Sequence, residues 1–183
     1  MELDFTIDTL GEPTVPSPIG LSTHRADYVS SYVSDDQYLL YDIETGPEVA
    51  VGPVPRAELL ELAGPREQIY FDAAKLRAGI VTCGGLCPGL NDVIRSIVMC
   101  LYYRYGVKQI CGFRFGYRGL LPEFALPVLE LTPATVVDIH REGGTILGSS
   151  RGYGDRTGEI VDCLERMNLN VLFTGGMTVF ILL

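Results

Sequence analysis

From residue 78 onward, short apolar runs alternate with segments of helical periodicity, and this alternation constrains the fold more than any other feature. The run 78–83 is rich in β-branched residues, which predicts a buried strand. Residues 92–105 place apolar side chains at helical spacing and stop at Gly106, and a second apolar strand is expected at 108–115. A strand, a helix and a strand in this order predict a βαβ unit with parallel strands.

The alternation continues further along the chain. Helices are expected at 133–142 and 158–168, and strands at 145–149 and 169–176. Parallel strands need crossovers that cover both faces of their sheet. The pattern therefore predicts an α/β fold with a doubly wound, mostly parallel sheet. A ligand would bind at the carboxyl ends of the strands, near the point where the strand order reverses.

Residues 1–77 have a different texture, with many prolines and acidic residues. Short strands are expected at 28–33 and 38–43, and one or two turns of helix at 57–63. We expect this part to be an N-terminal extension, and residues 78–183 to form the α/β part of the chain.

The net charge of −9, from 14 basic and 23 acidic residues, argues against nucleic-acid binding, which relies on a basic surface. No apolar run approaches the roughly 20 residues that cross a bilayer, so no membrane association is expected. Five cysteines without paired CxxC motifs, and no basic-then-apolar leader, favour the cytoplasm. Cys83 and Cys87 alone are too few for a zinc site, which takes four ligands, so no metal-ligating residue is predicted.

A glycine-rich loop, 84–91, leaves the first predicted strand and enters a helix. Glycine lets the backbone approach a ligand closely, and a helix N-terminus presents free amides to an anion. A phosphate cradle explains the loop, and so does a tight turn that needs glycine for its geometry alone. The loop is neither the GxGxxG fingerprint nor a Walker loop, which requires GK[ST].

Two further loops are expected after predicted strands. Arg151 lies in the loop 148–152, and its guanidinium can bind two phosphate oxygens at once, although a surface ion pair is the simpler alternative. Tyr117 lies in the loop 116–119, where its ring can stack on a base or cover the edge of the core. Three such loops together favour a site for a phosphorylated ligand.

Four segments, in this order and at this spacing, resemble the 6-phosphofructokinases: TCGGLCPGLNDVIRSIV, GFRFGYRGLLPE, GGTILGSSRGY and LNVLFTGG. The likeness extends over roughly 66–176 and is greatest to the branch with a long N-terminal extension, which includes plant, trypanosomatid and related bacterial enzymes. The resemblance implies a Rossmann-like domain, usually in a homo-oligomer. It implies phosphoryl transfer in glycolysis, with Mg²⁺, from ATP or pyrophosphate to the 1-hydroxyl of fructose 6-phosphate, giving fructose 1,6-bisphosphate.

The resemblance also implies roles for individual residues. Arg151 would be catalytic, reaching the donor phosphates and stabilising the transferring group. Gly85 would lie against those phosphates and Tyr117 near the nucleotide. The complete set implied to bind the nucleotide cofactor comprises Gly84, Gly85, Tyr117, Arg151, Gly152, Gly175 and Gly176.

The sequence departs from the family pattern after Gly176. The family continues into a GGDGT or GGDD loop, whose first Asp serves Mg²⁺ and whose next position helps to separate ATP users from pyrophosphate users. Here the residues are Met177, Thr178 and Val179, and the TIDND loop of the family does not follow. The resemblance thus implies that residues 78–183 are an α/β half-domain that binds nucleotide phosphates and is incomplete at its C-terminal end. We therefore expect a truncated enzyme that is inactive alone, and the choice between ATP and pyrophosphate stays open.

Codons ATG ACG GTN for Met177 to Val179, read two bases later, give Asp-Gly, so a frameshift, a damaged gene or a sequencing error just after Gly176 would explain this departure. Two alternatives to a truncated phosphofructokinase stay open. One is a non-catalytic fragment that binds a nucleotide or phosphate, and the other is a defective gene product without function.

Overall fold

The structure is a computed structural model that describes residues 4–24, 30–41 and 53–176. The chain divides into two compact units, Met1–Phe71 and Asp72–Leu183. Each unit is described by itself below. Among the described residues, no helix has the length and apolar character needed to cross a membrane.

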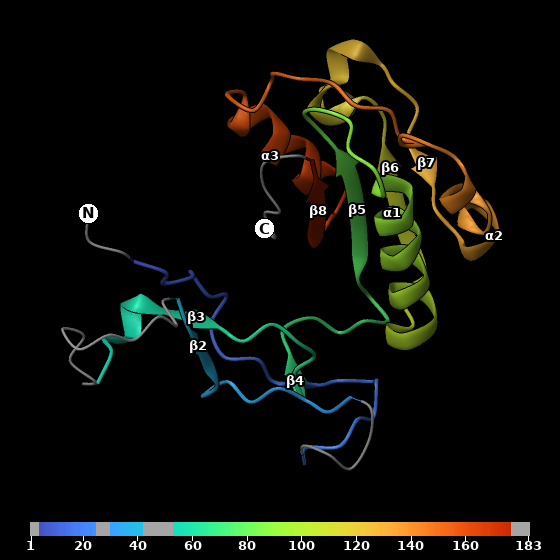
Figure 1. Ribbon diagram of the computed structural model, residues 1–183. Coiled ribbons are helices and arrows are strands. Elements are labelled where there is room, and N and C mark those ends of the chain that lie inside the picture. The colour runs from blue at the N-terminus through green and yellow to red at the C-terminus, as the bar shows by residue number, and fades with distance from the viewer. Residues whose placement is uncertain (1–3, 25–29, 42–52, 177–183) are drawn as a thin grey trace. The chain divides into compact units, whose positions relative to one another are not determined.

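The second unit is built on a four-stranded sheet in the order β7-β6-β5-β8 (Figure 1). The central strand β5 (Arg77–Thr82) pairs in parallel with β6 (Gln109–Phe113) on one side and with β8 (Val171–Gly175) on the other. A short strand that the sequence pattern did not reveal, β7 (Leu129–Glu130), pairs antiparallel with β6. The sheet is therefore mostly parallel, as predicted.

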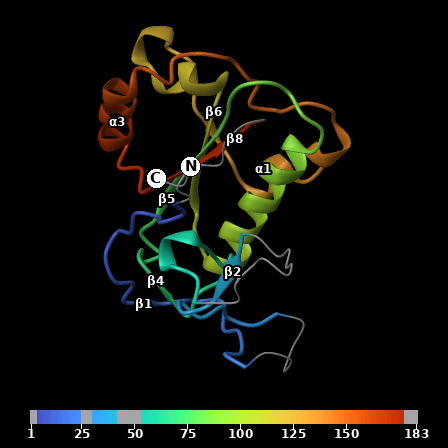
Figure 2. The same cartoon turned by 60° about the vertical axis from the view of Figure 1, so that its left-hand side comes forward.

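Helices cover both faces of this sheet, which confirms the predicted doubly wound α/β fold. Figure 2 shows α1 (Leu90–Met99) and α3 (Thr157–Arg166) with the strands between them. Side chains of β5 alternate between the two faces. Ile80 belongs to the core cluster formed with α1, and Val81 belongs to the cluster that includes Ile160 of α3.

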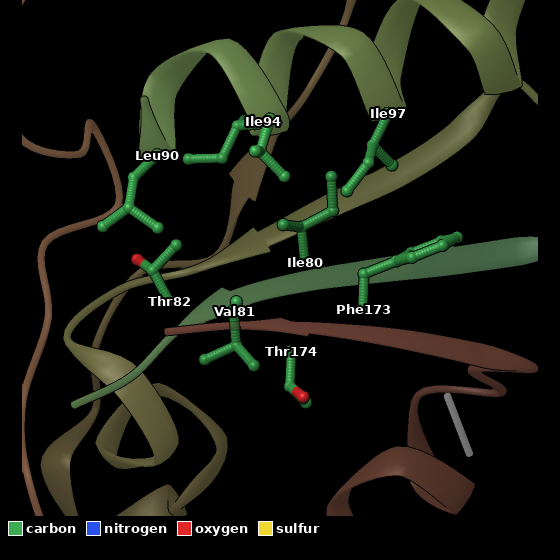
Figure 3. A pocket seen from close by; sticks show the side chains of 10 residues that line it. Ile80, Val81, Thr82, Leu90, Ile94, Ile97, Phe173 and Thr174 are labelled. Carbon is green, nitrogen blue, oxygen red and sulfur yellow. The ribbon is translucent and has the colours of Figure 1, made fainter. Parts of the chain in front are cut away.

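Helix α1 anchors itself to the sheet through one apolar face. Figure 3 shows Leu90, Ile94 and Ile97 pointing from the helix toward Ile80 and Phe173 of the sheet. The space left between them is about 10 Å³ and is lined by apolar surface. A space of that size holds at most about one water molecule, so this interface is a packed core and not a ligand site.

This packing predicts a large loss of stability when Ile94 is shortened. Ile94 is 1% exposed, so Ile94→Ala leaves a cavity and should lower the free energy of unfolding by about 2–5 kcal/mol. Val161→Ala is the control, because Val161 is 38% exposed on α3, and it should change stability by less than about 0.5 kcal/mol. Thermal denaturation followed by circular dichroism measures both. Equal melting temperatures for the two variants would contradict the described packing.

The prediction of a strand at 145–149 is wrong, because this segment forms a turn. The Gly148 amide donates to the Thr145 carbonyl, and the Leu147 carbonyl accepts from the Phe115 amide at 2.8 Å. Leu147 is completely buried. The apolar character of this segment therefore reflects the burial of Leu147, and not an extended segment paired in the sheet.

The helix predicted at 133–142 is interrupted. Thr132 caps a four-residue helix, α2 (Pro133–Val136), and a 3₁₀ turn follows at Ile139–Arg141. The predicted helix 92–105 is continuous, since α1 passes into a π-helical segment, Cys100–Tyr105.

Shorter helical turns follow β6. Two 3₁₀ turns, Gly116–Leu120 and Pro122–Phe124, come after that strand.

The first unit contains two small antiparallel sheets. In one, β1 (Val15–Pro16) pairs with β4 (Gln68–Ile69). In the other, β2 (Tyr38–Leu40) pairs with β3 (Leu59–Glu61). The predicted strand at 38–43 is present as β2, and residues 42–43 of the prediction lie outside the described residues.

Two predictions for the first unit are wrong. The helix expected at 57–63 is a 3₁₀ turn, Arg56–Glu58, followed by β3. A seven-residue segment is too short for a stable helix of its own, so pairing with β2 decides its conformation. Within the predicted strand 28–33, residues 28–29 lie outside the described residues, and residues 30–33 form only an isolated bridge between Ser31 and Ser22.

Candidate functional site

A cavity of about 520 Å³ lies where β5 and β6 end. The chain leaves β5 through α1 to reach β6 on one side, whereas β8 pairs on the other side, so the strand order reverses at β5. Ligands of open α/β sheets bind at such a point. The cavity is lined by Cys83, Gly84, Gly85, Tyr117, Ser150, Arg151, Gly152 and Gly154.

The structure brings most of the predicted site residues together. Those that line the cavity are Gly84, Gly85, Tyr117, Arg151 and Gly152. Gly175 and Gly176 do not line it but lie beside it, since the Cys83 amide donates to the Gly175 carbonyl at 2.8 Å. Sequence reasoning missed Cys83, Ser150 and Gly154 as lining residues. Their only signal is proximity, because each lies within two residues of a predicted position.

Arg151 is the one charged side chain among the lining residues. It is exposed, and it forms no ion pair or hydrogen bond with any residue that the structure describes. The alternative of a surface ion pair is therefore not realised in the described part of the chain. The cavity presents an uncompensated positive charge on a protein whose net charge is −9.

Arg156, five residues further along, is bound on two sides. Its Nε donates to Glu159 at 2.7 Å, and one terminal nitrogen donates to Glu123 at 2.5 Å. These two carboxylates raise the pKa of the Arg156 guanidinium. Arg156 thus ties the end of the Arg151 loop to the 3₁₀ turn that contains Glu123, while Arg151 stays available for a ligand.

Backbone amides contribute at the start of the loop after β5. The Gly84 amide is used internally, since it donates to the Ser150 carbonyl at 2.9 Å. The Gly85 amide has no partner within the described residues, and Gly85 lines the cavity. The first turn of α1 does not line it, and Asp92 places a carboxylate in that turn. The amides that can meet an anion are therefore those of the loop and not those of the helix.

Tyr117 forms an aromatic wall of the cavity. Burial raises the pKa of its hydroxyl, and a hydrogen bond with the Cys83 side chain acts in the same direction. One edge of the ring lies close to Gly154, where an added Cβ atom would be 3.7 Å from Cε2. The wall suits a planar group more than a second phosphate.

The residues present do not by themselves form a site for Mg²⁺. This ion takes oxygen ligands and is usually held through one or two carboxylates. No carboxylate lines the cavity, and the described residues contain no cluster of three or more His, Cys, Asp or Glu side chains. No chemical step is therefore assigned to a metal held by this part of the chain.

The end of β8 approaches the end of β5 so closely that only glycine fits at one position. A Cβ atom on Gly176 would lie 2.1 Å from the Cys83 carbonyl oxygen, whereas a Cβ on Gly175 would come no nearer than 3.7 Å to any atom. Gly176→Ala should therefore push β8 away from Cys83 and destabilise the protein by about 1–3 kcal/mol. Gly175→Ala should change stability far less. Urea denaturation compares the two, and equal midpoints would contradict this close approach.

The fold and the cavity define a doubly wound α/β domain with a ligand site at its switch point. The model of the phosphofructokinase family matches residues 77–180. The chain belongs to the phosphofructokinase family, as its sequence motifs predicted.

Several curated relatives are similar over most of this chain. It is 48% identical over 174 residues to the ATP-dependent 6-phosphofructokinase of Borreliella burgdorferi, covering 95% of this chain and 38% of that protein. It is 43% identical to the Trypanosoma brucei brucei enzyme, covering 94% and 35%. It is also 43% identical to ATP-dependent 6-phosphofructokinase 1 of Arabidopsis thaliana, covering 94% and 34%. The chain thus spans little more than a third of the length of these relatives.

Proposed function

We propose that this chain forms the N-terminal part of a 6-phosphofructokinase that transfers a phosphoryl group from ATP to fructose 6-phosphate, giving fructose 1,6-bisphosphate. The observation that carries the proposal is the meeting of Arg151, which no described residue pairs with, and Gly84 and Gly85 in one cavity at the switch point. Family membership supports it. Because the chain spans about a third of its relatives, the activity belongs to a longer protein.

Each lining residue receives a role that its surroundings support. The guanidinium of Arg151 binds oxygens of the donor phosphates and stabilises the charge of the transferring group. The Gly85 amide, which has no partner among the described residues, donates to the same phosphates. Gly152, with a φ angle of 88°, gives the Arg151 loop a conformation that glycine adopts without strain. Tyr117 lies against the nucleotide. Gly175 and Gly176 act from beside the cavity: Gly175 accepts a hydrogen bond from the Cys83 amide, and the missing side chain of Gly176 lets β8 approach Cys83.

ATP is the donor that we propose over pyrophosphate. Both molecules would contact Arg151 and Gly85, but only a nucleotide has a planar base to meet the wall formed by Tyr117. The three relatives described above are all named ATP-dependent.

The wider setting is also a proposal. Residues 1–77 would form an extension to the nucleotide-binding half-domain 78–183, and the complete enzyme would be a homo-oligomer. The five cysteines are free, which suits a glycolytic step in the reducing cytoplasm.

Removing the charge of Arg151 should weaken ATP binding. A hydrogen bond to a charged group contributes about 1.5–3 kcal/mol, so Arg151→Gln should raise the Kd for ATP about tenfold or more. Arg141→Gln is the matched control, because it removes the same charge from a side chain that is 75% exposed and lies outside the cavity, where it pairs with Asp138. Isothermal titration calorimetry measures both variants. Unchanged affinity in Arg151→Gln would contradict the role of Arg151.

A second candidate is a fragment that binds a nucleotide or phosphate without transferring it. The absence of carboxylates among the residues that line the cavity favours this alternative, because it leaves the chain without a metal ligand or a base there.

A chimera distinguishes the two candidates. Residues 77–176 of this chain would replace the aligned residues of the Borreliella burgdorferi enzyme, and fructose 1,6-bisphosphate would be assayed. The proposed function predicts that product is formed. A folded chimera that binds ATP but yields no product would support the non-catalytic alternative.

A further inference from the structure

We propose that Ser150 is a positioning residue, which joins the three loops around the cavity and thereby sets the place of Arg151. This inference rests on the proposed function, in which Arg151 binds phosphate. Ser150 itself was not among the residues that the sequence indicated. It directly precedes Arg151 and lines the same cavity.

The hydroxyl and the backbone carbonyl of Ser150 contact two different loops. Its hydroxyl donates to the Phe115 carbonyl, with 2.6 Å between the oxygens. Its backbone carbonyl accepts from the Gly84 amide at 2.9 Å. One residue therefore links the segment after β6 to the loop after β5. Figure 1 shows the chain between α2 and α3 running past the ends of these two strands.

Neighbouring bonds hold the same segment from its N-terminal side. The Ser149 hydroxyl donates to the Gly84 carbonyl at 2.8 Å. The buried Thr82 hydroxyl donates to the Gly148 carbonyl at 2.7 Å. Residues 148–150 are thus fixed at each position, and the exposed Arg151 begins where these bonds end. Ser150 is the last fixed residue before the cation.

Gly116 makes room for this arrangement. A Cβ atom at Gly116 would lie 2.9 Å from the Ser150 hydroxyl oxygen and 3.1 Å from its carbonyl oxygen. The φ angle of Gly116 is 64°, a conformation that glycine adopts without strain. The segment after β6 can therefore come close enough for Phe115 to accept the hydroxyl.

The contacts of Ser150 with Phe115 and Gly84, called the clamp below, preorganise the loop that carries Arg151. A guanidinium whose backbone is already placed loses less conformational freedom when it binds a phosphate, so affinity rises without an additional contact. If Ser150 acts in this way, its contribution to binding depends on Arg151. A residue that merely stabilised the fold would contribute equally whether or not Arg151 was present.

A double-mutant cycle tests this dependence. ATP binding to the full chain is measured by calorimetry for wild type, Ser150→Ala, Arg151→Gln and the double variant. Ser150→Ala should raise the Kd about three- to tenfold in the wild-type background, and should have no further effect when Arg151 is Gln. Ser96→Ala, which removes an exposed hydroxyl on α1, is the control and should leave the Kd unchanged. An equal effect of Ser150→Ala in both backgrounds would overturn the proposal.

Hydrogen exchange separates this inference from the proposed function. The Ser150 carbonyl protects the amide of Gly84 from exchange. Peptides covering 84–89 should therefore exchange faster than wild type in Ser150→Ala, and at the wild-type rate in Arg151→Gln. A wild-type chain that does not bind ATP would overturn the proposed function, and exchange would still decide the clamp. Unchanged exchange in Ser150→Ala would overturn the clamp. Gly116→Ala, which crowds the same hydroxyl, should reproduce the faster exchange if Ser150→Ala does not fold.

Discussion

The parallel pairing of β5 with a strand on each side is the interaction on which the second unit depends. Buried backbone groups must be hydrogen-bonded, and a strand buried on both faces can satisfy them only through neighbouring strands. Beyond the last paired residue, the Cys83 amide still donates to the Gly175 carbonyl. The loop after β5 therefore begins at a fixed point, and so does the cavity beside it.

The candidate site follows from loops that bind to one another. Gly84, Ser149 and Ser150 use their polar groups to join the segments after β5 and after α2. Arg151 is left without a partner among the described residues, in a chain of net charge −9. A local cation in an acidic protein favours binding of a specific anion at one place, and not general attraction of polyanions.

Agreement between prediction and structure depends on what holds each segment. The strands β5, β6 and β8 and the helix α1 were predicted, because their apolar residues follow the period of the element and point into one core. The segments 57–63 and 145–149 were not, because their conformation depends on partners distant in sequence, namely β2 for the first and Phe115 for the second. Of the predicted site residues, Gly175 and Gly176 alone lie outside the cavity lining.

The sequence by itself determined the α/β class, the family and the loops that carry Gly84, Gly85, Tyr117 and Arg151. Local periodicity and motif spacing are properties of neighbouring residues, so they can be recognised along the chain. Only the tertiary structure decided that Arg151 has no partner among the described residues, that Ser150 joins two other loops, and that Gly176 lies against Cys83. The contacts of Ser150 and Gly176 join residues at least 35 positions apart, and no local pattern encodes such contacts or their absence.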